Sequence, residues 1–177
     1  MERPADDVVI RPATEADADT IVQAVRRLGH HVGTPEKVTS TAEDIRRYGF
    51  GADPMFECLI AEIGGRPAGL CIYFRSFSTF IGRPGVYVQD LFVDERFRGA
   101  RVGERLLRRV AAITLARGGV YMRLAVDIGN PDAGRFYRRL GLKHVDDDLI
   151  HAAYGEAFLR LAEERPSAAA PTKGDQP

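Results

Sequence analysis

The sequence has no tryptophan, only two cysteines and no excess of either charge, because 25 Lys and Arg balance 25 Asp and Glu. A neutral chain is poorly suited to coating nucleic acid, whose phosphates are held mainly by surplus Lys and Arg. No apolar run approaches the ~20 residues that a membrane-spanning helix requires. The first residues are acidic and lack the apolar core of a secretory signal. We therefore expect a cytoplasmic protein with neither nucleic acid nor membrane as a partner.

The two cysteines lie in two predicted strands that Gly64-Gly65 would join as a hairpin. Counting outward from a two-residue turn places Cys58 opposite Cys71, at a non-hydrogen-bonded pair with Cα atoms about 4.5 Å apart. Reduced, buried thiols are the state that the cytoplasm favours. A strained cross-strand disulfide stays open as the alternative.

Hydrophobic periodicity and turn residues divide the chain into helices and strands. The predicted strands are 8–12, 56–63, 67–75, 86–93, 120–127, 142–145 and 149–154. The predicted helices are 15–28 after a Thr14 cap, a helix with a Ser40 and Glu43 capping box that ends near Tyr48, 102–116, 131–140 and 155–164. This order predicts an α/β (α+β) fold with a mixed sheet. We expect one domain over residues 1–164 and a disordered tail over 165–177.

One segment, 90–107 (DLFVDERFRGARVGERLL), runs from an apolar strand through an Arg- and Gly-bearing turn into a strong helix that begins near Val102. Free N–H groups and the dipole at a helix N-terminus suit a diphosphate, and Arg98 and Arg101 add positive charge. The spacing is neither that of a Walker loop nor that of a GxGxxG dinucleotide fingerprint. The segment therefore predicts either a phosphate cradle or an ordinary strand-to-helix turn.

Several further segments, taken together with this one, resemble the motifs of a known protein family. They are VIRPAT (9–14), GFG (49–51), ECLIAE (57–62), STFIGRPG (78–85), QDLFVDERFRG (89–99) and NPDAGRFYRRLG (130–141). Through them, roughly residues 8–162 resemble the GNAT superfamily of acetyl-CoA-dependent N-acetyltransferases, most closely its diamine (spermidine/spermine-type) branch. The resemblance implies the GNAT fold, a mostly antiparallel central sheet with helices on both faces, splayed at the acetyl-CoA-binding strand. It also implies a homodimer, and we expect no metal.

The resemblance assigns acetyl-CoA contacts position by position. The backbone of Leu91, Phe92 and Val93 would bind the pantetheine arm and the thioester. The pyrophosphate would lie against the turn, formed by Arg98, Gly99, Ala100, Arg101, Val102, Gly103 and Glu104. Asn130, Ala133 and Tyr137 would contact the cofactor from the next helix.

Tyr137 is the predicted general acid. Amine attack on a thioester expels a thiolate whose conjugate acid has a pKa near 8.5, and a phenol with a pKa near 10 can hydrogen-bond to it or protonate it. The adjacent Phe136 faces another way on the helix and is the expected core aromatic. Arg101 stands where the family usually has glycine, and we expect a right-handed backbone there with the N–H and the side chain both contacting phosphate.

The acceptor site departs from the polyamine branch. Gln89 occupies the position of a glutamate that assists deprotonation of the amine, and Asp90 would face the other side of the strand unless a bulge intervenes. Val32, beside His31, replaces an acidic residue. Fewer carboxylates weaken the fit for a polycation, and proton removal is expected to use water and backbone carbonyls. Gln89, Asp90, His31 and Val32 are the candidate substrate-binding residues.

The expected function is transfer of an acetyl group from acetyl-CoA to a primary amine of a small diamine or amino-acid-like molecule, by direct attack in a ternary complex. A protein or aminoglycoside N-acetyltransferase is a weaker alternative. A non-catalytic acyl-CoA-binding module of the same fold is favoured by Gln89 and opposed by Tyr137 and Asn130. A nucleic-acid binder that uses the arginines of helix 131–140 is opposed by the zero net charge.

Overall fold

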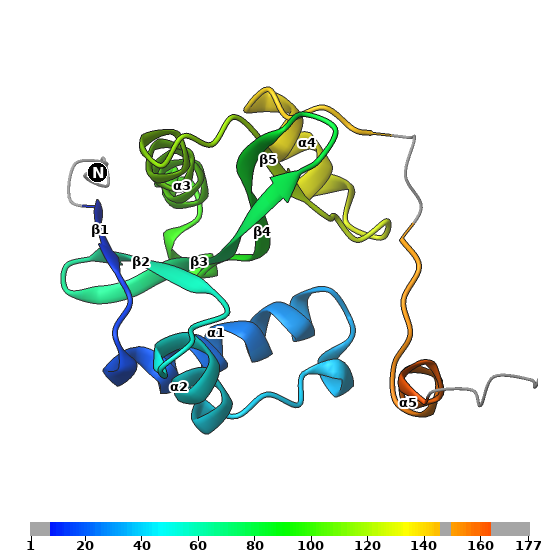
Figure 1. Cartoon of the computed structure of the whole chain (residues 1–177). Helices are drawn as coiled ribbons and strands as arrows, with labels where there is room; N and C mark the ends of the chain where they lie inside the picture. The colour runs from blue at the N-terminus through cyan, green and yellow to red at the C-terminus, as the bar shows by residue number, and fades with distance from the viewer. Residues whose placement is uncertain (1–7, 146–149, 164–177) are drawn as a thin grey trace, which may run out of the picture. The chain divides into compact units, whose positions relative to one another are not determined.

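The computed structural model describes residues 8–145 and 150–163 (Figure 1). They divide into two compact units between Leu142 and Lys143, and the second unit contains helix α5 (Glu156–Ala162). None of the helices in these ranges combines the length and the apolar character needed to cross a bilayer. One domain over residues 1–164 stays a prediction, and the predicted tail at 165–177 lies outside the described residues.

A five-stranded sheet of order β1-β2-β3-β4-β5 forms the centre of the first unit. Its strands are β1 (Val8–Pro12), β2 (Glu57–Ile63), β3 (Arg66–Ser78), β4 (Arg83–Val93) and β5 (Met122–Leu124). The first four pair antiparallel, and β5 runs parallel to β4. The predicted mixed, mostly antiparallel sheet is confirmed. However, β5 is shorter than predicted, and none of the described residues in the predicted strands 142–145 and 149–154 forms a strand.

Helices cover both faces of this sheet (Figure 1). On one face lie α1 (Ala18–His31) and α2 (Ala42–Phe50), which bury what we call the α1-side core: Ala18, Ile21, Val22, Ala24, Ile45, Cys58, Ile60, Leu70 and Ile72. On the other face, α3 (Val102–Ala116) buries the α3-side core: Leu59, Ala61, Ala68, Cys71, Tyr73, Val86, Val88, Val102, Leu106, Leu107 and Val110. Side chains of α4 (Pro131–Arg139) pack against this second core. The short 3-10 turns are η2 (Glu15–Asp17), η3 (Pro35–Lys37) and η4 (Glu95–Phe97).

The helix starts differ slightly from the predicted ones. Thr14 forms its capping box with Asp17 around η2, so α1 begins only at Ala18. The predicted capping box of α2 is wrong by one residue, because Thr41 and Asp44 form it instead of Ser40 and Glu43. The Asp44 carboxylate accepts both the Thr41 N–H (2.8 Å) and its hydroxyl (2.7 Å), as a glutamate would in the commoner motif.

The predicted pairing of Cys58 with Cys71 is wrong. The β2–β3 pairs nearest the turn are as expected, but Ala68 is an extra residue in β3, since Ala61 pairs with Gly69. This bulge shifts the register by one, so that Cys58 lies opposite Ile72. Cys58 consequently belongs to the α1-side core and Cys71 to the α3-side core, and both cysteines are free.

A second bulge lies in β4. Tyr73 pairs with Val88 and Ile72 pairs with Asp90, which leaves Gln89 as an extra, exposed residue. The bulge on which the orientation of Asp90 was expected to depend is therefore present. Asp90 shares a face with its buried partner Ile72 of the α1-side core.

The expected right-handed backbone at Arg101 is wrong. Arg101 is the N-cap of α3 with φ 56° and ψ 24°, the left-handed conformation. Among the described residues it is the only non-glycine with positive φ. The α3 helix itself begins at Val102 and ends at Ala116, as predicted.

We predict that neither cysteine of the native protein reacts with a thiol reagent. Cys58 and Cys71 are 6% and 0% exposed, and burial raises the pKa of the Cys71 thiol to about 12 and that of Cys58 further. Unfolding in denaturant without reductant should release both thiols for titration. A requirement for reductant would contradict the structure.

We predict that Arg101→Gly stabilises the fold by about 1 kcal/mol in urea unfolding. A left-handed non-glycine residue costs about 1–2 kcal/mol, part of which is offset by the greater entropy of glycine in the unfolded chain. Arg109→Gly, at an exposed position inside α3, is the matched control and should destabilise by about 1 kcal/mol. Equal losses in both variants would rule out strain at Arg101.

Candidate active site

The outer edge of β4 is paired along only part of its length. β5 pairs with Val86–Val88, and no strand of the described residues continues this pairing along Gln89–Val93. The sheet therefore splays at β4, the strand to which the family resemblance assigned the thioester. Unpaired backbone N–H and C=O groups at such an edge can bind an extended ligand.

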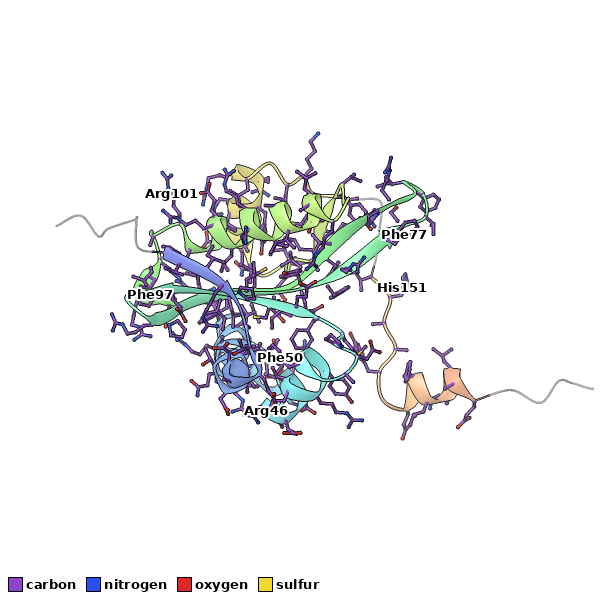
Figure 2. The ribbon with its side chains drawn as sticks, turned by 60° about the vertical axis from the view of Figure 1, so that its left-hand side comes forward. Arg46, Phe50, Phe77, Phe97, Arg101 and His151 are labelled. Carbon is purple, nitrogen blue, oxygen red and sulfur yellow. The ribbon has the colours of Figure 1, made fainter. Side chains whose placement is uncertain are left out.

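The turn after β4 leads to an uncapped helix N-terminus. In the described part of the chain, no hydrogen bond reaches the N–H groups of Val102, Gly103 or Glu104, and Arg101 provides no side-chain cap. Gly99, at φ 91°, and the left-handed Arg101 form this turn, and the Arg101 side chain is exposed at the start of α3 (Figure 2). Orphan N–H groups at the positive end of a 15-residue helix fit a diphosphate.

Close packing joins this helix start to β4 and α4. A Cβ atom at Gly103 would lie 3.3 Å from the Phe136 ring, 3.4 Å from Val93 and 3.7 Å from Leu91. Glycine at position 103 lets these groups approach. We call the turn and helix start at residues 98–104 the cradle, and it forms one continuous region with the open edge of β4 and the first turns of α4. Tyr137 follows Phe136 directly and lies in the same region.

Tyr137 is half-buried and packs, like Phe136, against the α3-side core. The two rings meet edge to face with centroids 5.2 Å apart. Burial, together with the nearby Cys71 thiol, raises the pKa of Tyr137 to about 12. No hydrogen bond from the described residues reaches its hydroxyl, so this proton is available to a ligand.

Asp90 approaches the splayed edge from the opposite face. Its carboxyl has no hydrogen bond or ion pair among the described residues, and burial raises its pKa above the usual value. Cys71 pairs with Leu91, the residue after Asp90, and belongs to the α3-side core against which Tyr137 packs. The Asp90 carboxyl and the Tyr137 phenol therefore belong to opposite faces of the sheet near this pair.

Other predicted contacts are distributed around this region. Asn130 is the N-cap of α4, and its Oδ1 accepts a hydrogen bond from the Ala133 N–H at 3.1 Å. This oxygen therefore has a structural role at the helix start. Ion pairs engage Arg98 with Glu95 (3.3 Å) and Glu104 with Arg108 (2.9 Å), while Ala100 packs against the α3-side core. His31 is the last residue of α1 and Val32 its C-cap, because α1 continues three residues beyond its predicted end at Leu28.

Sequence reasoning missed Asp94, the one buried charged residue in the described part of the chain, at 2% exposure. Its carboxylate accepts Arg96 Nη2 (2.7 Å) and Arg27 Nη1 (2.6 Å), and these guanidinium groups hold the pKa of Asp94 far below its usual range. Asp94 directly follows β4 and caps η4 through the Arg96 N–H. It therefore fixes the turn between the open edge and the cradle. An Asp before a short turn is a recognisable cap signal, but Arg27 comes from the distant α1.

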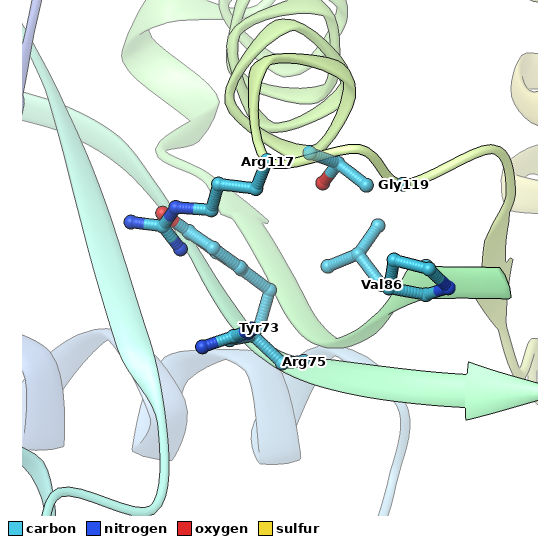
Figure 3. A pocket seen from close by; sticks show the side chains of 8 residues that line it. Tyr73, Arg75, Val86, Arg117 and Gly119 are labelled. Atoms are coloured by element: carbon cyan, nitrogen blue, oxygen red, sulfur yellow. The ribbon is translucent and has the colours of Figure 1, made fainter.

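A small pocket lies at the other end of α3, lined by Tyr73, Arg75, Val86, Arg117 and Gly119, among others (Figure 3). Arg117 pairs bidentately with Glu57, which also accepts the Tyr73 hydroxyl at 3.2 Å. The Arg117 guanidinium lowers the pKa of Glu57. The charges of this pair neutralise each other, and the pocket contains none of the predicted site residues.

The acetyltransferase (GNAT) family model matches residues 24–142. The chain is 34% identical over 166 residues to thialysine N-epsilon-acetyltransferase of Sus scrofa, covering 88% of this chain and 97% of that protein. It is 27% identical over 139 residues to spermidine/spermine N(1)-acetyltransferase-like protein 1 of Homo sapiens, covering 75% of this chain and 20% of that protein.

Among solved structures, an integron cassette protein from the mobile metagenome of V. cholerae matches with a TM-score of 0.76 at 20% identity, covering 89% of this chain and 99% of that one. At that identity the likeness shows the fold, which is the predicted one. The family model matches more than half of this chain, and the Sus scrofa relative is more than 30% identical over most of both chains. The chain therefore belongs to the acetyltransferase (GNAT) family and is an acetyl-CoA-dependent acyltransferase.

Proposed function

We propose that this protein transfers the acetyl group of acetyl-CoA to a terminal primary amine of a small diamine or amino-acid-like molecule, by direct attack in a ternary complex. The observation that carries the proposal is the arrangement at β4. An unpaired strand edge leads into the uncapped N-terminus of α3, with Asp90 on one face of the sheet and Tyr137 packed on the other. The similarity to a thialysine N-epsilon-acetyltransferase supports an amine of this kind.

The cofactor would be held by backbone rather than by charge alone. The N–H groups of Val102, Gly103 and Glu104 would bind the pyrophosphate, with Arg101 able to reach it. The free edge of Leu91–Val93 would pair with the pantetheine arm. Acetyl-CoA supplies the activated thioester carbonyl, and side chains of this protein would carry out the two proton transfers.

Asp90 is the group suited to receive the amine. An alkyl ammonium has a pKa near 10.4 and must lose a proton before it attacks, which costs roughly 4–5 kcal/mol at pH 7. Gln89 cannot accept that proton. The unpaired carboxylate of Asp90 would attract the ammonium group and accept the proton directly or through water.

Tyr137 is suited to the leaving group. When the carbon–sulfur bond of the tetrahedral intermediate breaks, the sulfur takes the electron pair and requires a proton. The raised pKa of Tyr137 keeps its phenol protonated until the sulfur departs. Burial would also raise the pKa of a CoA thiol at this position, so the departing thiolate would be a stronger base and a better proton acceptor. Tyr137 would first donate a hydrogen bond and then the proton, and solvent would restore the phenol.

The alternative functions differ from this one in turnover or in the acceptor. A non-catalytic acyl-CoA-binding module would bind CoA without turnover, while a protein or aminoglycoside N-acetyltransferase would require a different acceptor. The homodimer and the cytoplasmic location stay predictions from the resemblance and the sequence.

Release of free thiol from acetyl-CoA, measured over a panel of small primary amines, tests the proposal. Turnover of at least one such amine is expected. Binding of CoA in calorimetry without turnover of any amine would favour the binding module, and absence of both would overturn the proposal.

We predict that Tyr137→Phe lowers kcat by roughly 10- to 100-fold and leaves the KM for acetyl-CoA nearly unchanged, because only the proton donor is lost. Steady-state thiol release measures both constants. Tyr48→Phe, at an exposed tyrosine of α2, is the control and should be silent. A full-rate Tyr137→Phe enzyme would exclude Tyr137 as the acid.

We predict that Asp90→Asn lowers kcat/KM for the amine by roughly 100-fold and at the same time stabilises the fold at pH 7. Because burial raises the folded-state pKa of Asp90, stability falls as pH rises from the unfolded pKa through that raised value. The neutral amide removes this cost. Activity of the natural protein should fall as Asp90 becomes protonated on acidification.

Urea unfolding and a pH–rate profile measure the two effects of Asp90→Asn. Asp53→Asn, in an exposed turn, is the control and should change neither. A variant with unchanged activity and an unchanged acidic limb would mean that Asp90 does not act on the amine.

A further inference from the structure

The face of β4 that carries Asp90 also carries Phe92, two residues further along the strand. Both lie on the side covered by α1, since Phe92 packs against the α1-side core and Asp90 pairs with Ile72 of that core. α1 places Arg27 here, with its guanidinium carbon 5.1 Å from the centre of the Phe92 ring. One strand face thus has a carboxyl group near its middle and a guanidinium group at its end.

Arg27 is held in place but retains binding capacity. Its Nη1 donates to Asp94 at 2.6 Å, and a cation–π contact with the Phe92 ring gives the guanidinium group a second point of attachment. Its side chain is 49% exposed, and no hydrogen bond among the described residues uses its Nε or Nη2. Asp94 also forms an ion pair with Arg96, so one carboxylate is shared between two guanidinium groups. Arg27 therefore presents an oriented and incompletely neutralised cation to solvent.

The order of the two charges along this face suits a zwitterionic acceptor. Asp90 and Phe92, the residue whose ring Arg27 contacts, are two strand residues apart, so their Cα atoms are separated by about 6.6 Å along the strand. An amino acid whose side chain ends in an amine four or five bonds from Cα spans about 6–8 Å between that nitrogen and its carboxylate. Such a zwitterion could place its ammonium at Asp90 and its carboxylate at Arg27.

We propose that Arg27 is a specificity-determining residue that binds the carboxylate of the acceptor, so that the preferred acceptor is a zwitterionic amino acid with a terminal amine rather than a diamine. This inference rests on the proposed function. His31 lies one helical turn beyond Arg27 on the same side of α1, where its imidazole can add a hydrogen bond to the carboxylate. The second ammonium of a diamine would instead meet the positive charge of Arg27.

Two matched acceptor pairs test the proposal: lysine against cadaverine, and ornithine against putrescine, which differ only in the carboxylate. The natural protein should have the lower KM for the amino acid of at least one pair. Arg27→Gln keeps a donor for Asp94 but removes the charge. It should raise the KM for that amino acid by roughly 10- to 100-fold, and leave unchanged or lower the KM for the diamine.

The KM for acetyl-CoA is the readout that separates specificity from a structural role, because Arg27 also holds the turn through Asp94. It should stay within about twofold in Arg27→Gln, and Arg26→Gln, at the neighbouring exposed arginine, should leave all constants unchanged. Equal losses with both members of a pair, or a large rise in the KM for acetyl-CoA, would overturn the role in specificity. A natural protein that prefers the diamines would overturn it while leaving the proposed function intact. No turnover of any amine would overturn both.

Discussion

The bulge at Gln89 is the constraint on which the rest of this site depends. A strand alternates its side chains, so one extra residue exchanges the two faces for everything that follows. Val86 and Val88 point to the α3-side core before the bulge, and Leu91 and Val93 pack against the same core after it. Without the extra residue, Asp90 would face α3 and Leu91 would face α1. The bulge therefore brings a carboxyl group to the face covered by α1 without disturbing the apolar packing of α3.

The open edge of β4 explains how reactants could approach from different directions. Asp90 belongs to the face covered by α1, whereas Tyr137 packs with the α3-side core. In the proposed direct attack on a thioester, one group would take a proton from the amine and a different group would give a proton to the departing sulfur. A sheet edge with a carboxyl group on one face and a phenol on the other would keep these two groups apart, and Asp94 holds the strand end and the following turn in register.

The sequence predicted the framework well and the irregularities poorly. Helix α3 was predicted to the residue, because its apolar periodicity is strong and Arg117-Gly118-Gly119 ends it. The bulge at Ala68 was not predicted, since it depends on how β3 packs against its neighbours rather than on local propensity. The Arg27–Asp94 pair joins residues 67 positions apart and leaves no local pattern. Motif resemblance named the turn after β4 and Tyr137 as candidate site residues, but the face on which Asp90 lies required the three-dimensional register.

Arg101 has a consequence for how the cradle works over a catalytic cycle. Its left-handed backbone fixes the outward orientation of the helix N–H groups as part of folding, before any ligand arrives. A diphosphate that binds there loses little affinity to ordering of the loop, since that entropy has already been lost. The free energy of folding therefore already includes the strain of the left-handed Arg101 backbone and the entropy lost in ordering the loop. In the proposed function, CoA and acetyl-CoA would therefore exchange on a loop whose conformation is already set by folding.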